Sequence, residues 1–160
     1  MNTNTEIFLD AGLFIGAIMK ADPRELEAYP IIEAARNGDI RTCTTVGVLS
    51  EVYAGLTWVN APFPLTPEEA RAAIYELIEA PSPIRVLSDG LEAALLHVQI
   101  ASRLHLTARR IHDARHAATA LQNRVTHVYT YDPNDWSDFA PDGIVIAGPP
   151  STLARLSNSP

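Results

Sequence analysis

Short runs of β-forming residues alternate with longer amphipathic segments of helical periodicity along nearly the whole chain. This alternation is typical of an α/β fold, in which helices connect neighbouring parallel strands. Five strands are predicted, at Glu6–Leu9, Ile40–Cys43, Ile84–Leu87, His127–Thr130 and Ile144–Ile146. We therefore predict an α/β fold of three layers, α/β/α, around a central, mainly parallel five-stranded sheet.

Local sequence signals indicate where several helices begin and end. Thr66-Pro67-Glu68-Glu69 combines a capping box with proline at the first helical position, and predicts a helix that continues to Ala80. Asn37-Gly38 is a helix C-terminal signal. Either Thr44 or Thr45 can cap the next helix. That helix is expected to carry Val48, Val52, Leu56 and Val59 on one face.

The second half of the chain contains two further predicted helices. Ser88 is predicted to cap a long helix, and another helix is predicted from Ile111 to Asn123. The long helix has an apolar stripe formed by Leu91, Leu95, Val98 and Ser102.

The chain of 160 residues is long enough for one domain with a substantial core. We predict a single domain over residues 1–148 and a loose, Pro- and Ser-rich tail over residues 149–160. Cys43 is the one cysteine in the sequence, which favours a reducing, cytoplasmic setting. The apolar stretch Ile7–Met19 is interrupted by Asp10 and is too short to cross a bilayer, so no membrane partner is expected.

The formal net charge of −7 restricts the possible nucleic-acid partners. Proteins that bind duplexes usually carry a basic surface, because contacts to phosphates supply much of their affinity. The charge balance therefore argues against a duplex-binding module. It argues less strongly against a nuclease, whose acidic residues can surround a metal ion that attracts phosphate.

Two carboxylates in the first half of the chain occupy positions that a solvated surface does not explain. Asp10 follows the first predicted strand, at the sheet edge where open α/β sheets bind ligands, although an Asp there equally suits a helix N-cap. Glu51 lies on a predicted helix face with small or apolar neighbours, where a carboxylate needs a partner. A cation would supply that partner, and a bond to a backbone group is the alternative.

Two further carboxylates lie in the second half. Asp113 is near the start of a predicted helix, on the same stripe as Ala117 and Ala120, although the helix dipole alone would favour an acid there. Asp132 follows the fourth predicted strand in a loop where Asx-turn chemistry is sufficient, and Asp135 in the same loop is the alternative fourth acid. Together, such carboxylates form an all-oxygen cluster that suits Mg²⁺ or Mn²⁺.

Four segments of the chain resemble the PIN-domain nucleases, particularly the bacterial VapC-type toxins. They are Ile7–Ala11, Thr45–Val52, His112–Ala120 and Val128–Asp132. The order Asp, Glu, Asp, Asp and the element that carries each acid match the family from Glu6 to Gly148. The resemblance implies a PIN-like fold over this range.

The resemblance also implies a function. It implies a metal-dependent endoribonuclease that hydrolyses RNA phosphodiester bonds, acting as the toxin of a type II toxin–antitoxin pair. Asp10, Glu51, Asp113 and Asp132 would be both the catalytic and the metal-binding residues, with Mg²⁺ or Mn²⁺ as the cofactor. The implied partners are an RNA substrate, a second copy of the chain in a homodimer, and a small antitoxin protein. The alternative is a non-catalytic PIN-like module that binds RNA or a protein.

Two positions near the expected site differ in how well they match the family. Thr130 matches a Ser or Thr that often lies beside the site. Ala11-Gly12 stands where many family members carry a small polar residue soon after the first Asp, which leaves the contacts around Asp10 undefined.

Other polar and aromatic residues suggest further roles. His112 and His116 have the spacing of zinc ligands on one helix face, but no Glu follows the first histidine, so exposed or RNA-contacting histidines are favoured. Trp58 and Trp136 could stack on bases, although Trp58 falls on the helix that carries Glu51 and is expected in the core. The candidates for phosphate contact are Lys20, Arg24, Arg103, Arg109, Arg110 and Arg115, with a solvated surface as the alternative for each.

Overall fold

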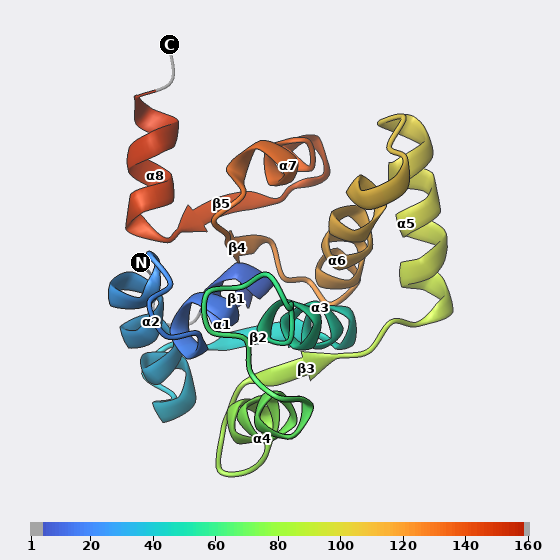
Figure 1. Cartoon of the computed structure of the whole chain (residues 1–160). Coiled ribbons are helices and arrows are strands. Elements are labelled where there is room, and N and C mark those ends of the chain that lie inside the picture. The colour runs from blue at the N-terminus through green and yellow to red at the C-terminus, as the bar shows by residue number, and fades with distance from the viewer. Residues whose placement is uncertain (1–4, 159–160) are drawn as a thin grey trace.

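The computed structural model describes residues 5–158, which form a central sheet with helices on both faces (Figure 1). Within this range the sheet has five strands in the order β3-β2-β1-β4-β5, and every neighbouring pair is parallel. The predicted α/β class is therefore confirmed, and the sheet is wholly rather than mainly parallel. The strands are β1 (Ile7–Leu9), β2 (Thr42–Thr45), β3 (Arg85–Leu87), β4 (His127–Tyr129) and β5 (Val145–Gly148).

Helices connect successive strands, as the alternating pattern predicts. The helices are α1 (Ala11–Ile18), α2 (Glu25–Asn37), α3 (Val46–Leu56), α4 (Pro67–Ile78), α5 (Leu91–Arg103), α6 (Ile111–Gln122), α7 (Pro133–Ser137) and α8 (Pro150–Ser157). Short 3₁₀ turns at Ala108–Arg110 and Ala140–Asp142 precede α6 and β5.

The strand order creates a switch point in the middle of the sheet. The chain moves outward on one side of β1 through β2 and β3, and then returns to place β4 and β5 on the other side. The ends of β1 and β4 lie side by side at the carboxyl edge of the sheet, where the chain switches direction. In open α/β sheets this switch point is the usual place for a ligand.

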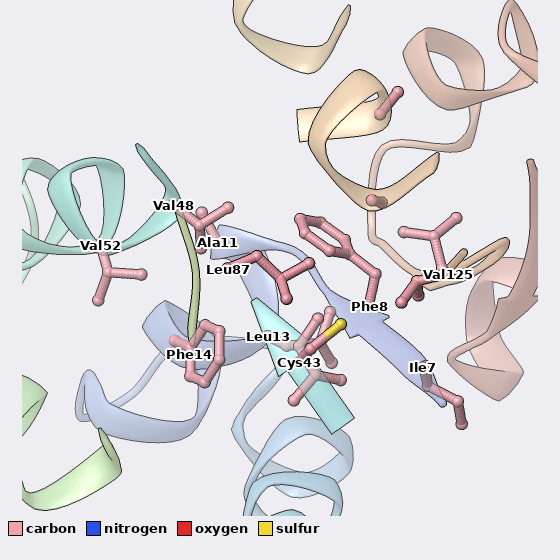
Figure 2. Close-up of a cluster of buried hydrophobic side chains, with 14 of the residues drawn as sticks. Ile7, Phe8, Ala11, Leu13, Phe14, Cys43, Val48, Val52, Leu87 and Val125 are labelled. Atoms are coloured by element: carbon pink, nitrogen blue, oxygen red, sulfur yellow. The ribbon is translucent and has the colours of Figure 1, made fainter. Parts of the chain in front are cut away.

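The core forms around β1, because both faces of this central strand are covered. Phe8 packs on the ring of Trp136 from α7, with ring centroids 5.4 Å apart, and on His116 from α6. Leu13, Val48 and Val52 are fully buried around the same strand, as Figure 2 shows. Continuous burial of a central parallel strand is what the apolar run Ile7-Phe8-Leu9 predicts.

Two of the helix caps agree with the local signals. The capping box at Thr66 and Glu69 is present in full, with Thr66 N–H donating to Glu69 and Glu69 N–H donating to Thr66 Oγ1. Of the two threonines proposed for α3, Thr45 is the N-cap, and its Oγ1 accepts from Val48 N. These motifs form reliably because every group involved lies within four residues of the others.

The predicted cap at Ser88 is wrong. Gly90 is the N-cap of α5 and contributes no side-chain bond. The preceding residue, Asp89, is instead held by α6, where it accepts from Arg115 and from Thr119. This long-range pairing fixes the path of the loop before α5 and leaves Ser88 outside the helix end.

The apolar stripe of α5 faces solvent. Leu91, Leu95 and Val98 are 76%, 63% and 64% exposed, whereas Ala93 and Ile100 are the buried residues of the helix. The helix thus packs through the face of Ala93 and Ile100, and the predicted stripe lies on the surface.

Helix α3 ends earlier than the sequence pattern suggests. Thr57 Oγ1 donates to Tyr53 O and Leu65 N donates back to Leu56 O, so the chain turns away after Leu56. Trp58 therefore lies beyond the helix and is 59% exposed, which contradicts its expected place in the core.

The segment predicted as a loose tail is ordered over most of its length. Pro150–Ser157 forms α8, and the buried Thr152 donates its hydroxyl to Thr130 O at 2.8 Å. Residues 159 and 160 lie outside the described range. A proline in the first turn and the anchoring hydroxyl explain why this polar segment folds onto the sheet edge. Within residues 5–158, no helix is long and apolar enough to cross a membrane.

Candidate active site

Asp10 lies at the switch point, directly after β1, and its side chain is partly buried. It is also the N-cap of α1, with Oδ1 accepting from Ala11 N at 2.8 Å. The capping and functional interpretations of this residue are thus compatible. Burial raises the pKa of Asp10, while hydrogen bonds from Thr130 and the Ala11 N–H act in the opposite direction.

Two side chains from the β4 end of the chain fix the second oxygen of Asp10. Thr130 Oγ1 donates to Asp10 Oδ2 at 2.7 Å, and Trp136 Nε1 donates to the same atom at 3.2 Å. Thr130 thus occupies the expected position beside Asp10. Trp136 is fully buried, so it is a hydrogen-bond donor within the protein and not a surface for stacking bases. These two donors provide the contacts that Ala11-Gly12 leave unspecified.

Glu51 of α3 is partly buried and has a histidine as its partner. Glu51 Oε1 lies 2.9 Å from His116 Nε2, and 38% of the glutamate side chain is exposed. On the other side of the ring, His116 Nδ1 lies 2.9 Å from Thr45 Oγ1, the N-cap atom of α3. The expectation that His116 is exposed is wrong, because only 1% of it is accessible. Its spacing of three residues from Asp113 was the signal for an inward position.

Asp113 of α6 lies beside Glu51 in a surface groove that Gly47, Ser50, Ala54, His112 and Arg115 also line. Desolvation, together with the negative charges of Asp10, Asp135 and Glu51, raises the pKa of Asp113 to about 7. Asp113 is therefore within electrostatic reach of both other acids. The four expected positions thus include three that converge: Asp10, Glu51 and Asp113.

The fourth acid lies in the loop after β4. Asp132 is exposed, and its backbone N–H donates to Thr130 Oγ1. Burial raises the pKa of Asp132, and the charge of Asp135 adds to that effect. Asp135, one helical turn into α7, is the residue of this loop whose charge acts on Asp113. Asp135 is thus the acid of this loop that has an electrostatic connection to Asp113, and Asp132 lies next to Asp135 at the N-cap of α7.

Most of the basic residues considered for phosphate contact form ion pairs within the protein. Arg24 pairs with Asp22, Arg103 with Asp142, Arg110 with Asp135 and Asp138, and Arg115 with Asp89. Lys20 is exposed, and the side chain of Arg109 lies outside the described part of the chain. Acidic partners therefore neutralise much of the positive charge near this edge.

The residues of the site suit a divalent cation by their chemistry. Carboxylate oxygens are the ligands that Mg²⁺ and Mn²⁺ prefer. Burial and mutual repulsion raise the pKa values of Asp10 and Asp113, and a cation would reverse that effect. Among the described residues, no three His, Cys, Asp or Glu side chains already form a ready ligand set.

A wholly parallel sheet with carboxylates grouped near its switch point defines an α/β protein with an acidic candidate site. The family model described as the PIN domain matches residues 7–140 of this chain. The chain therefore belongs to the PIN-domain family. No curated protein sequence matches it.

Solved structures with the same fold include several toxins. The structure of VapC20 from Mycobacterium tuberculosis, described as a Sarcin-Ricin loop cleaving toxin, has a TM-score of 0.66 and 19% identity, covering 89% of this chain and 99% of that one. A DNA-bound VapBC from Salmonella typhimurium has a TM-score of 0.59 and 21% identity, covering 88% and 95%. A toxin-antitoxin complex from Klebsiella pneumoniae has a TM-score of 0.57 and 19% identity, covering 88% and 96%. At these identities the similarity establishes the fold.

Proposed function

We propose that this chain is a metal-dependent endoribonuclease that hydrolyses RNA phosphodiester bonds, and that it is the toxin of a type II toxin–antitoxin pair. The observation that carries the proposal is the convergence of Asp10, Glu51 and Asp113 at the switch point of a PIN-family sheet. The similarity to VapC20, which is described as cleaving the Sarcin-Ricin loop, supports RNA as the substrate class.

In this proposal each acid has a defined task. Asp10, Glu51 and Asp113 would hold Mg²⁺ or Mn²⁺, with Asp132 or Asp135 completing the set directly or through water. A bound divalent cation supplies charge neutralisation at the scissile phosphate and an acidified water as the nucleophile. The chain itself fixes Asp10 through Thr130 and the Trp136 indole, so one carboxylate is preorganised before any ligand binds.

A groove next to the acids offers a path for the RNA backbone. Arg24, Arg155 and Tyr131 line it, and Tyr131 immediately precedes Asp132. Both arginines are held in place by protein groups, Arg24 by Asp22 and Arg155 by Tyr131 O. Arg24 and Arg155 would contact phosphates that flank the cleaved bond, with part of the positive charge offset by Asp22 and by Glu27, which also lines the groove.

The experiment that tests the function is cleavage of a panel of structured RNAs in EDTA, Mg²⁺ and Mn²⁺. The wild type is compared with Asp10→Asn and with Asp39→Asn, whose exposed side chain precedes β2 at the opposite edge of the sheet. We expect metal-dependent cleavage that Asp10→Asn abolishes and Asp39→Asn preserves. Absence of cleavage by folded, inhibitor-free protein under all conditions would instead favour a non-catalytic PIN-like binding module.

A small antitoxin protein is the proposed partner. Support comes from the similar structures described as a toxin-antitoxin complex and as VapBC. The test is co-purification with the product of a neighbouring gene that encodes a small DNA-binding protein, followed by assay of the complex. Suppressed RNA cleavage in the complex, restored after its removal, is the expected result.

A second copy of the chain is the proposed partner of α5. The exposed stripe Leu91, Leu95 and Val98 is the apolar surface expected of a helix that packs on another copy. Light scattering on the wild type should report a dimer, and Leu95→Glu should shift it to monomer. Leu26→Glu, at a 94% exposed position on α2, is the matched control and should leave the dimer intact.

A further inference from the structure

We propose that His116 is a positioning residue that fixes the orientation of the Glu51 carboxylate, and that Thr45 in turn fixes the ring. This inference rests on the proposed function for its role in catalysis, since Glu51 is one of the acids assigned to the cation. His116 itself touches neither cation nor RNA. It acts by donating its Nε2–H to Glu51 Oε1 and so leaving Oε2 as the oxygen available to a ligand.

The hydrogen bonds of Thr45 determine where the imidazole proton lies. Thr45 is fully buried, so its hydroxyl hydrogen needs an acceptor inside the protein. Thr45 Oγ1 already accepts from Val48 N, and its other contact is His116 Nδ1 at 2.9 Å. If Thr45 donates to Nδ1, a neutral ring carries its proton on Nε2, where Glu51 Oε1 lies 2.9 Å away. Every donor and acceptor in the chain Thr45–His116–Glu51 is then satisfied.

The other neutral tautomer leaves buried groups unsatisfied. With the proton on Nδ1, the Thr45 hydroxyl hydrogen would lose its acceptor and the Nε2 lone pair would face a carboxylate oxygen. Of the two neutral tautomers, the arrangement therefore favours the one with its proton on Nε2, a donor aimed at the acid. A doubly protonated ring donates from Nε2 to the same oxygen.

Packing holds the ring in this orientation. The His116 ring stacks on Phe8 of β1, with centroids 6.3 Å apart and planes inclined by 28°. Gly47 lies against its opposite side, where an added Cβ would lie only 2.7 Å from His116 Cε1. Because the ring is confined between β1 and α3, its Nε2–H has a fixed direction. The hydrogen bond to Oε1 therefore fixes the orientation of the Glu51 carboxylate. Hydrogen bonds of this kind to metal-binding side chains raise metal affinity by fixing the ligand.

Two conservative substitutions separate the two hydrogen bonds of His116. In His116→Gln the amide nitrogen reaches the position of Nε2 and can still donate to Glu51. In His116→Asn the shorter amide reaches the position of Nδ1 and can contact Thr45 but not Glu51. Both variants lose the ring, so their losses of stacking are comparable. A purely structural role of His116 would therefore change metal affinity similarly in both variants. A positioning role would weaken metal binding much more in His116→Asn than in His116→Gln.

The first measurement uses the full-length wild-type protein in EDTA and requires no cation. Long-range ¹H–¹⁵N spectra of the ring should show a protonated Nε2. Glu51→Gln should perturb the Nε2 resonance far more than the Nδ1 resonance. A ring without a proton on Nε2, or equal perturbation of both resonances, would overturn the inference.

The second measurement is Mn²⁺ affinity by electron paramagnetic resonance, together with thermal unfolding of each variant. We expect about 10-fold weaker binding for His116→Asn and affinity near that of the wild type for His116→Gln, at similar unfolding temperatures. Equal affinities of the two variants would overturn the inference. If the wild type bound no Mn²⁺, the proposed function would fail, and the ring spectra would still decide whether His116 orients Glu51.

Discussion

Replacing Asp113 with Asn should stabilise the metal-free protein at neutral and alkaline pH. The carboxyl of Asp113 has a pKa raised to about 7, mainly because burial disfavours its ionised form and secondarily because Asp10 and Asp135 are negative. At pH 8 the folded protein therefore carries a carboxylate in an unfavourable environment. Asn keeps the shape of the side chain and removes the charge, so the variant avoids this cost.

The size of the effect follows from the pKa. A rise from 3.8 to about 7 corresponds to at most about 4 kcal/mol of lost stability at high pH. Because the side chain is partly exposed, solvent screening reduces this to about 1–2 kcal/mol. Asp113 also lies in the first turn of α6, where its charge interacts favourably with the helix dipole by about 0.5 kcal/mol. The net gain for Asp113→Asn is thus about 1 kcal/mol, or about 2–4 °C in Tm for a chain of this length.

The gain has a defined dependence on pH. The folded state binds the Asp113 proton more tightly than the unfolded state, because its folded pKa lies above the unfolded value. Stability contributed by this group is therefore highest below about pH 4, falls as the pH rises towards about 7, and is level above that. Asp113→Asn should be most advantageous above pH 7 and nearly neutral near pH 4. Asp10 and Asp132, whose pKa values are also raised, leave a residual slope of the same sign in the variant.

The assay is urea unfolding of both proteins in EDTA at several pH values between 4 and 8. Asp39→Asn, at an exposed position at the opposite edge of the sheet, is the control for removal of one negative charge. Addition of Mg²⁺ should stabilise the wild type more than Asp113→Asn, because the variant lacks one of the proposed ligands. A variant no more stable than the wild type at pH 8, or a gain independent of pH, would refute the reasoning.

Three further predictions concern single buried groups. Thr130→Val should lower the free energy of unfolding in urea by about 1.5–3 kcal/mol, because it removes a donor to the partly buried Asp10 carboxylate. Thr130→Ser keeps the hydroxyl and should retain most of the stability, so equal losses in the two variants would contradict this role. Thr45→Val should lower the free energy of unfolding by about 1–2 kcal/mol, because it removes the N-cap of α3 and the donor to His116. Thr45→Ser keeps the hydroxyl and should lower it much less in the same assay. Burial raises the pKa of Cys43 to about 12. At pH 8 the native thiol should therefore react with a disulfide reagent only as fast as the protein unfolds locally. Rapid labelling of the folded protein would contradict this prediction.

Local interactions account for the elements that the sequence predicted accurately. The capping box of α4 and the left-handed Gly38 after α2 depend on groups within a few residues of each other, so the pattern alone specifies them. Strand β2 lies two residues later than its predicted span. Asp39 and Ile40 still donate to Ala34 O at the end of α2, and this bonding delays the strand to Thr42.

Which face of an amphipathic helix is buried depended on its neighbours. Both faces of α5 carry apolar residues, and the face of Ala93 and Ile100 is the one that packs on the rest of the protein. His116 illustrates the same limit, since its spacing from Asp113 allowed an inward position but nothing local required it. Its burial follows from Phe8 and Gly47, which come from distant parts of the chain.

The sequence by itself determined the α/β class, and it predicts that Asp10, Glu51 and Asp113 are neighbours at one edge of the sheet. It could do so because a parallel sheet brings all its carboxyl ends to the same side. Tertiary structure alone decided how those acids are held. The side-chain donors to Asp10 come from residues 120 and 126 positions away, and the partner of Glu51 lies 65 positions away. Hydrogen bonds over such separations depend on how the strands and helices pack together, and no local pattern specifies them.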